Sequence, residues 1–203
     1  MADDDSISRS SGSLSTSVLH RARCGDQNAF RRMVELFSPL VYFWCHACGL
    51  SHSDVEDVSQ QTFLKIYGSL NQFQRNTPHQ SFRAWIRSIT RSRITDHWRS
   101  VAMEPPTERE SDGAINLRDW PESIDEEEQL KFETKLLFEK AVKLIQQEFS
   151  QRDFQVIWRV SVDGQSARDV AIELGISPNA VHIINSRIRS RVRQEFGDLI
   201  DND

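Results

Sequence analysis

Polar and basic side chains near the end of the chain are the clearest indication of a chemistry. Residues 175–196 read GISPNAVHIINSRIRSRVRQEF, with amide and hydroxyl side chains first and four arginines after them. Amide and hydroxyl groups can pair with base edges in a DNA major groove, whereas arginines further along a helix hold phosphates. The positions expected to face outward are Asn179, His182, Ile183, Asn185 and Ser186, followed by Arg187, Arg189, Arg191 and Arg193.

The pattern around these residues predicts a helix-turn-helix. Ser166 is suited to cap a first helix, and Gly175 falls where the chain must leave that helix in a left-handed conformation. Ser177 and Pro178 then suit the cap and first turn of a second helix. An ordinary helical hairpin is the alternative, but the small residue Ala171, the glycine and the cap all fall at the offsets that a DNA-binding motif requires. The inward stripe of the second helix is Val181, Ile184, Ile188 and Val192.

A second basic segment, SFRAWIRSITRSRITDHWRS, covers residues 81–100. Arg83, Arg87 and Arg91 recur every four residues, next to aromatic side chains. Because unpaired bases stack on rings and phosphates need cations, this segment is predicted to bind nucleic acid. Core packing is the alternative for Phe82 and Trp85, and it is the preferred interpretation of Trp85.

The segment before it, residues 53–70, predicts a helix that begins at a capping box of Ser53 and Glu56. Its apolar positions face one way, and a polar ridge faces another. This ridge could bind a protein partner, although a solvated helix face would look the same. The ridge consists of Asp54, Asp57, Gln61 and Lys65.

Composition places these segments in an acidic, all-α chain. The 203 residues carry a formal net charge of −5, and alternating β-branched patterns are nearly absent. We expect a disordered tail over residues 1–17, a helical domain over 18–100, a flexible acidic linker over 101–129 and a second helical domain over 130–197. The linker holds ten acidic residues and two arginines, so the two domains are expected to move independently.

The same composition excludes several classes of protein. No apolar stretch is long enough to span a bilayer, and the N-terminus is unlike a signal peptide, so neither membrane insertion nor export is expected. An odd number of cysteines, three, favours a reducing cytoplasm without a disulfide framework. We expect no cofactor and no enzyme, since no nucleophile with a base and no phosphate loop is visible.

Taken together, the motifs resemble the extracytoplasmic-function (ECF) sigma factors, the promoter-recognition subunits of bacterial RNA polymerase. DVEDVSQQTFLKIY resembles conserved region 2.2, SFRAWIRSITRSRITDHWRS resembles regions 2.3 to 2.4, and the C-terminal block resembles region 4. Two motifs in this order with a linker between them are more specific than either alone. The PLVYFW segment is similar to the planctomycete-type subgroup.

The resemblance implies partners and site residues. The partners would be core RNA polymerase, through its β′ clamp helices and β flap, then promoter DNA, and an anti-sigma factor. The implied polymerase-binding residues are Asp54, Asp57, Gln60, Gln61 and Phe63. The implied −10 residues are Asn71, Arg75, Asn76, Phe82, Arg83, Arg87, Arg91 and Arg99. The implied −35 residues are Ser177, Asn179, His182, Asn185, Ser186, Arg187 and Arg189.

Two other interpretations stay open. A stand-alone helix-turn-helix regulator would bind DNA without polymerase, but it leaves the first block unexplained. A metal or redox protein could use the CHACGLSH segment, where Cys45, His46, Cys48 and His52 are liganding types. Cysteines in an apolar helix are more often simply buried, so we expect no metal site there.

Overall fold

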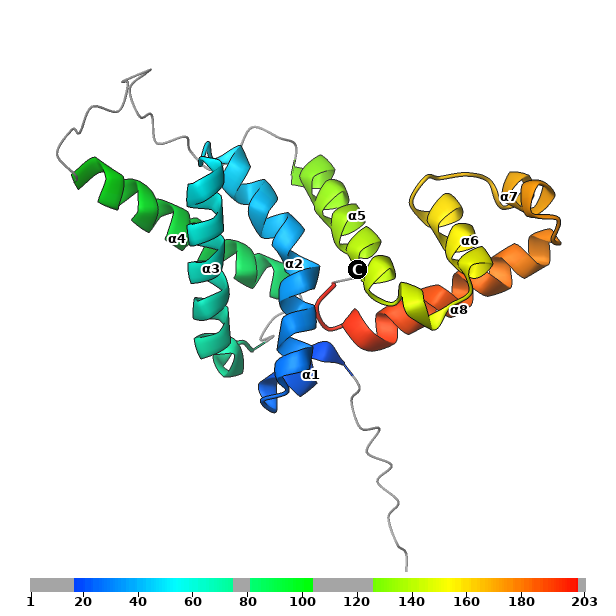
Figure 1. Ribbon diagram of the computed structural model, residues 1–203, viewed down its shortest axis with the longest axis horizontal. Coiled ribbons are helices and arrows are strands. Elements are labelled where there is room, and N and C mark those ends of the chain that lie inside the picture. Colours follow the sequence, from blue (N-terminus) through cyan, green and yellow to red (C-terminus); the bar gives the residue numbers. More distant parts are fainter. Residues whose placement is uncertain (1–16, 75–80, 104–125, 201–203) are drawn as a thin grey trace, which may run out of the picture.

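The computed structural model describes residues 17–74, 81–103 and 126–200, and within them every regular element is a helix (Figure 1). The prediction of an all-α fold is confirmed. The N-terminal elements are α1 (Val18–Arg23), α2 (Gln27–Ala47), α3 (His52–Ser69), the short 3-10 helix η1 (Leu70–Gln72) and α4 (Phe82–Met103). The C-terminal elements are α5 (Glu126–Leu144), the 3-10 helix η2 (Gln146–Glu148), α6 (Gln151–Ser161), α7 (Ala167–Leu174) and α8 (Pro178–Phe196).

Serine side chains begin most of these helices. Ser150, Ser166 and Ser177 each accept a backbone N–H from the residue three positions on, as their positions in the sequence predict. The cap of α3 was predicted wrongly. It is Ser51 rather than Ser53, because the Ser51 hydroxyl accepts the amide of Asp54 at 3.3 Å and donates to the Asp54 carboxylate at 2.5 Å.

Helices α1 to α4 form one block around a large apolar core. Phe37 and Trp44 of α2 and Phe82 of α4 are among its largest fully buried side chains. Burial of such a side chain stabilises a fold by roughly 1.5–3 kcal/mol. The apolar side of α3 faces this core as its spacing predicts, and its buried residues include Val55, Val58, Thr62 and Ile66.

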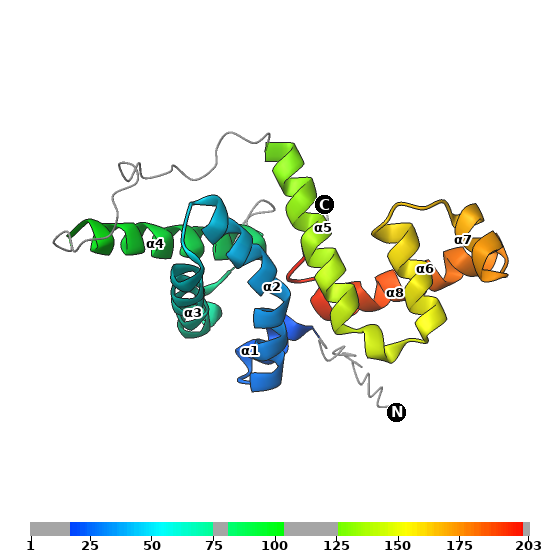
Figure 2. The same cartoon turned by 45° about the horizontal axis from the view of Figure 1, so that its top comes forward.

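Helix α5 lies against α2, so the two blocks share a core (Figures 1 and 2). Its buried residues Leu137 and Ala141 belong to the same apolar cluster as Trp44, and so do Ile188 and Phe196 of α8. The independent movement that the linker composition predicts stays a prediction. Helix α4 continues to Met103 and α5 begins at Glu126, so residues 101–103 and 126–129 are helical. The rest of the expected linker, residues 104–125, and the expected tail, residues 1–16, lie outside the described residues.

The helix-turn-helix lies at the far end of the molecule from α4 (Figures 1 and 2). A second, small apolar cluster of Val156, Val170, Ala171 and Val181 joins α6, α7 and the first half of α8. The second half of α8 returns to the shared core beside α1, α2 and α5. None of the described helices combines the length and the apolar composition needed to cross a lipid bilayer.

Candidate nucleic-acid interface

The turn of the helix-turn-helix is built as its sequence predicts. Gly175 ends α7 with φ +64°, a left-handed conformation that favours glycine. The amide of Ile176 donates to the carbonyl of Ala171 at 3.0 Å, which closes the last turn of α7. Val170 and Val181 are fully buried between the helices and fix the rotation of α8 about its axis. The side of α8 opposite Val181 is therefore presented to solvent.

Most of the predicted −35 residues lie on this exposed side, but one does not. Asn179, His182 and Ser186 are exposed, while the hydroxyl of Ser177 caps the helix. Asn185 was predicted wrongly as an outward residue. Its amide oxygen accepts the hydroxyl of Ser161 on α6 at 2.9 Å, and the side chain is half-buried between the two helices.

Three of the four arginines of α8 have side-chain partners that hold them within the chain. Arg187 pairs with Asp153 of α6 at 2.6 Å, and Arg189 donates to the hydroxyl of Ser161 at 3.2 Å. Arg187 still has a side chain that is 57% exposed, and Arg189 is exposed, so both could turn toward a phosphate. Arg191 instead forms part of an ion-pair network with Glu148 and Glu195 and is structural.

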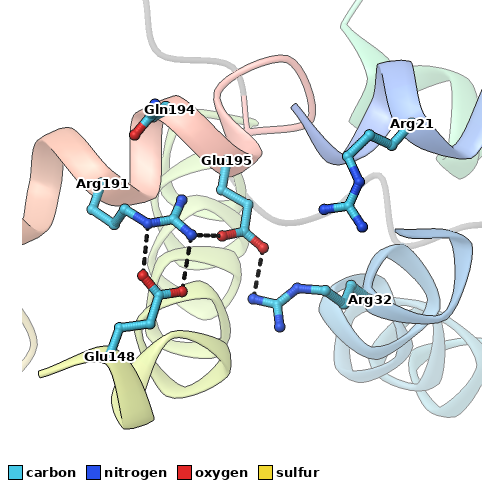
Figure 3. A pocket seen from close by; sticks show the side chains of 6 residues that line it. All are labelled: Arg21, Arg32, Glu148, Arg191, Gln194 and Glu195. Carbon is cyan, nitrogen blue, oxygen red and sulfur yellow. Dashed lines mark hydrogen bonds and ion pairs between the residues drawn. The ribbon is translucent and has the colours of Figure 1, made fainter. Parts of the chain in front are cut away.

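That network surrounds a cavity of about 550 Å³ between the two blocks (Figure 3). Glu195, with a side chain 6% exposed, lies between Arg32 of α2 at 2.6 Å and Arg191 at 2.5 Å. Arg191 also donates two hydrogen bonds to Glu148, at 2.7 and 2.9 Å. Burial lowers the pKa of Arg191, but the two carboxylates outweigh burial and hold that pKa above its ordinary value. The cluster is neutralised internally and holds α8 against α2.

The predicted −10 residues are divided among different environments. Asn71 on η1 and Arg91 and Arg99 on α4 are exposed. Arg75 and Asn76 lie outside the described residues. Phe82, another predicted −10 residue, is 0% exposed in this arrangement and packs edge-on against Phe37 and Phe73, so it belongs to the core.

Arg83 and Arg87 are covered by α5. Arg83 donates to the hydroxyl of Thr134 at 2.9 Å and lies 3.6 Å from the carboxylate of Glu133, while Arg87 donates to the amide oxygen of Gln129 at 3.3 Å. Glu133 is only 2% exposed, and it also accepts the indole N–H of Trp44 and the amide of Gln129, each at 2.8 Å. In this arrangement α5 occupies the side of α4 that was predicted to hold DNA.

The polar ridge of α3 is presented to solvent. Asp57, Gln60 and Gln61 are exposed, as is Leu64, which sequence reasoning did not single out. Leu64 follows Gln60 by four residues and Gln61 by three, a spacing that places it on the same ridge. Two of the implied polymerase-binding residues lie elsewhere. Asp54 bonds to Ser51 near α4, and Phe63 packs partly against the core.

The cysteine segment does not assemble a metal site. Cys45 and Cys48 are buried, whereas His46 and His52 are exposed. Burial raises the pKa of the Cys45 thiol to about 12, which disfavours the thiolate that a metal would need. Across residues 17–74, 81–103 and 126–200, no group of three or more His, Cys, Asp or Glu residues could hold a metal ion.

Comparison with known proteins supports the predicted resemblance of the N-terminal block to sigma region 2. Residues 33–102 match the family model of Sigma-70 region 2. That segment includes most of α2, all of α3 and nearly all of α4. It therefore contains the polar ridge of α3 and the basic segment of α4.

Several curated sigma factors are similar to this chain. The Probable RNA polymerase sigma factor RfaY of Xanthomonas campestris pv. campestris is 29% identical over 183 residues, 90% of this chain and 44% of RfaY. The ECF RNA polymerase sigma factor BldN of Streptomyces coelicolor is 28% identical over 83 residues, 41% of this chain and 31% of BldN. The RNA polymerase sigma factor CnrH of Cupriavidus metallidurans is 30% identical over 79 residues, 39% of this chain and 40% of CnrH.

These alignments span less than half the length of the curated relatives they match. A solved structure of CnrH in complex with the cytosolic domain of CnrY aligns over 88% of this chain and 94% of that one. Its identity is 20% and its TM-score is 0.36. The family model describes region 2 of Sigma-70, and each of these relatives is named as an RNA polymerase sigma factor.

Proposed function

We propose that this chain is a promoter-recognition subunit that binds core RNA polymerase and directs it to specific promoters. The observation that carries the proposal is the presence, in one chain, of a region 2 match over residues 33–102 and an intact helix-turn-helix over α7 and α8. A stand-alone regulator would need only the helix-turn-helix. The planctomycete-type subgroup stays a prediction from the PLVYFW segment.

Polymerase would bind the exposed ridge of α3. The ridge combines Asp57, Gln60 and Gln61 with the exposed leucine at position 64. An apolar side chain ringed by polar ones suits a protein interface, since it loses contact with water on binding while its neighbours form hydrogen bonds. The β′ clamp helices are the partner that the resemblance implies, and the β flap would receive the C-terminal block.

Promoter DNA would bind at two places. The exposed side of α8, with Asn179, His182 and Ser186, would read the −35 element. The basic side of α4 would hold the −10 element, but Arg83 and Arg87 are covered by α5. We infer that polymerase binding separates α5 from α2 and α4, so that both arginines become available to DNA. An anti-sigma factor that favours the closed arrangement is a further partner expected from the resemblance.

The experiment that tests the polymerase interface is co-purification with core polymerase. The double variant Asp57→Ala, Gln61→Ala should lose co-purification while its helical content is unchanged. Glu56→Ala is the matched control, because Glu56 is an exposed acid on the same helix about 100° round from Asp57. Unaltered co-purification of the double variant would exclude this ridge as the polymerase interface.

A further inference from the structure

One large apolar side chain lies on the exposed side of α8. Ile183 is 59% exposed, whereas Val181, Ile188 and Val192 of the same helix are buried. Ile183 belongs to neither apolar cluster, so it contributes no packing to the fold. Single exposed apolar residues are common on protein surfaces, and it is the surroundings of Ile183 that give this one meaning.

Those surroundings are the residues placed to meet base edges. Asn179 precedes Ile183 by four residues and Ser186 follows it by three, so all three share one side of the helix. His182 is its neighbour on that side, and all of these side chains are exposed. At about 100° per residue, the four side chains lie within an arc of about 100°. Ile183 is thus surrounded by hydrogen-bonding groups.

The charge of the helix favours a polyanion over an apolar protein surface as its partner. From Pro178 to Gln194, α8 carries no acidic residue and four arginines. Arg187 and Arg189 are exposed on either side of the strip that contains Ile183. A partner that fits both the arginines and the isoleucine must present negative charge along two edges and an apolar group between them.

A DNA major groove has this arrangement of groups. Phosphates line both of its edges, and the C5 methyl of thymine is the one apolar group that its base edges offer. We propose that Ile183 contacts a thymine methyl in the DNA element that α8 recognises, and that it selects an A·T pair in one orientation at that position. This inference rests on the proposed function, because it requires α8 to read DNA.

The experiment removes the methyl group from the DNA rather than from the protein. Selection from a random duplex library with the full-length chain and core polymerase first identifies the preferred −35 element. Each thymine of that element is then replaced in turn by deoxyuridine, which differs only by the missing methyl. At one position the replacement should weaken binding about four-fold, the effect expected for one buried methyl group. Ile183→Ala should bind the thymine and deoxyuridine forms equally, and Ile183→Val should still distinguish them.

Ile172→Ala is the matched control, because Ile172 is an isoleucine 71% exposed on α7, the other helix of the motif. It should retain the preference for thymine. Equal binding of both forms by the unaltered protein would overturn this inference alone, and so would a preferred element without an A·T pair. A library that yields no preferred element would overturn the proposed −35 reading and this inference with it.

Discussion

Trp44 on α2 donates its indole N–H to the carboxylate of Glu133 on α5 across 2.8 Å, although 89 residues separate them in sequence. Both side chains are buried, so neither can exchange its partner for water without a local opening. The same carboxylate lies 3.6 Å from Arg83. The Glu133 carboxylate therefore holds α5 against α2 and also covers Arg83 on the basic side of α4.

Glu133→Ala should lower the free energy of unfolding by about 3 kcal/mol, because it removes the buried carboxylate that contacts both the Trp44 indole and the Arg83 guanidinium. Denaturant unfolding followed by circular dichroism measures this change. Glu139→Ala on the same helix should change stability by less than about 1 kcal/mol, since Glu139 only approaches Lys135 at 4.0 Å. A variant at position 133 as stable as the one at 139 would contradict the role given to this contact.

The Arg32 network is the second connection between the blocks. Arg32 pairs with Glu195, donates to the carbonyl of Leu144 at 3.3 Å and lies over the ring of Phe196. Arg32→Ala should cost about 2 kcal/mol in the free energy of unfolding, the size expected for hydrogen bonds to a charged group. Arg31→Ala is the control, because Arg31 is the exposed neighbour. Equal stability of the two variants would show that the network adds nothing.

Two asparagines of α8 should separate DNA reading from folding. Asn179→Ala should cost about 1–3 kcal/mol in binding to the preferred −35 element and relax the preference there, with little change in stability. Asn185→Ala should lower stability and leave the preference intact, because its amide bonds to Ser161. A randomised −35 library and thermal unfolding of each variant measure the two effects. The reverse outcome would show that Asn185 reads DNA and that Asn179 supports the fold.

The buried thiol of Cys45 should make stability depend on alkaline pH. Burial raises its pKa from the ordinary value of 9.0 to about 12. Between these values the unfolded chain loses the thiol proton while the folded chain keeps it, so the free energy of unfolding falls as pH rises. Unfolding midpoints measured from pH 8 to 11 should fall more steeply for the natural protein than for Cys45→Ala. Equal pH dependence of the two proteins would show that the Cys45 thiol contacts water in the folded state.

Short-range patterns explain which parts of the fold the sequence predicts. The caps at Ser150, Ser166 and Ser177 and the left-handed turn at Gly175 depend on residues within a few positions, and all four are confirmed. Asn185 could also have been placed correctly, because it follows the buried Val181 by four residues. Its polar side chain was taken as a sign of exposure, yet a hydrogen bond to Ser161 satisfies it.

Long-range contacts explain what could not be predicted. Phe82 is buried because Phe37, which is distant in sequence, and Phe73 pack against its ring. The buried side of α4 continues through Thr90 and Ile94, since the Thr90 hydroxyl donates to the carbonyl of Ile86 and can be buried. Nothing local marks Glu133 as the acid that meets Trp44, so the cover over Arg83 and Arg87 was not foreseen.

We propose that the chain directs polymerase to new promoters rather than binding DNA by itself. Reconstituted transcription distinguishes these two activities. Purified protein is added to bacterial core polymerase with a library of random promoter fragments, and the 5′ ends of the transcripts are sequenced. We expect new start sites that share two elements at a fixed spacing upstream. These start sites should disappear with the Asp57→Ala, Gln61→Ala variant. No new start sites, together with tight protection of duplex DNA by the protein alone, would contradict this proposal and identify a stand-alone regulator instead.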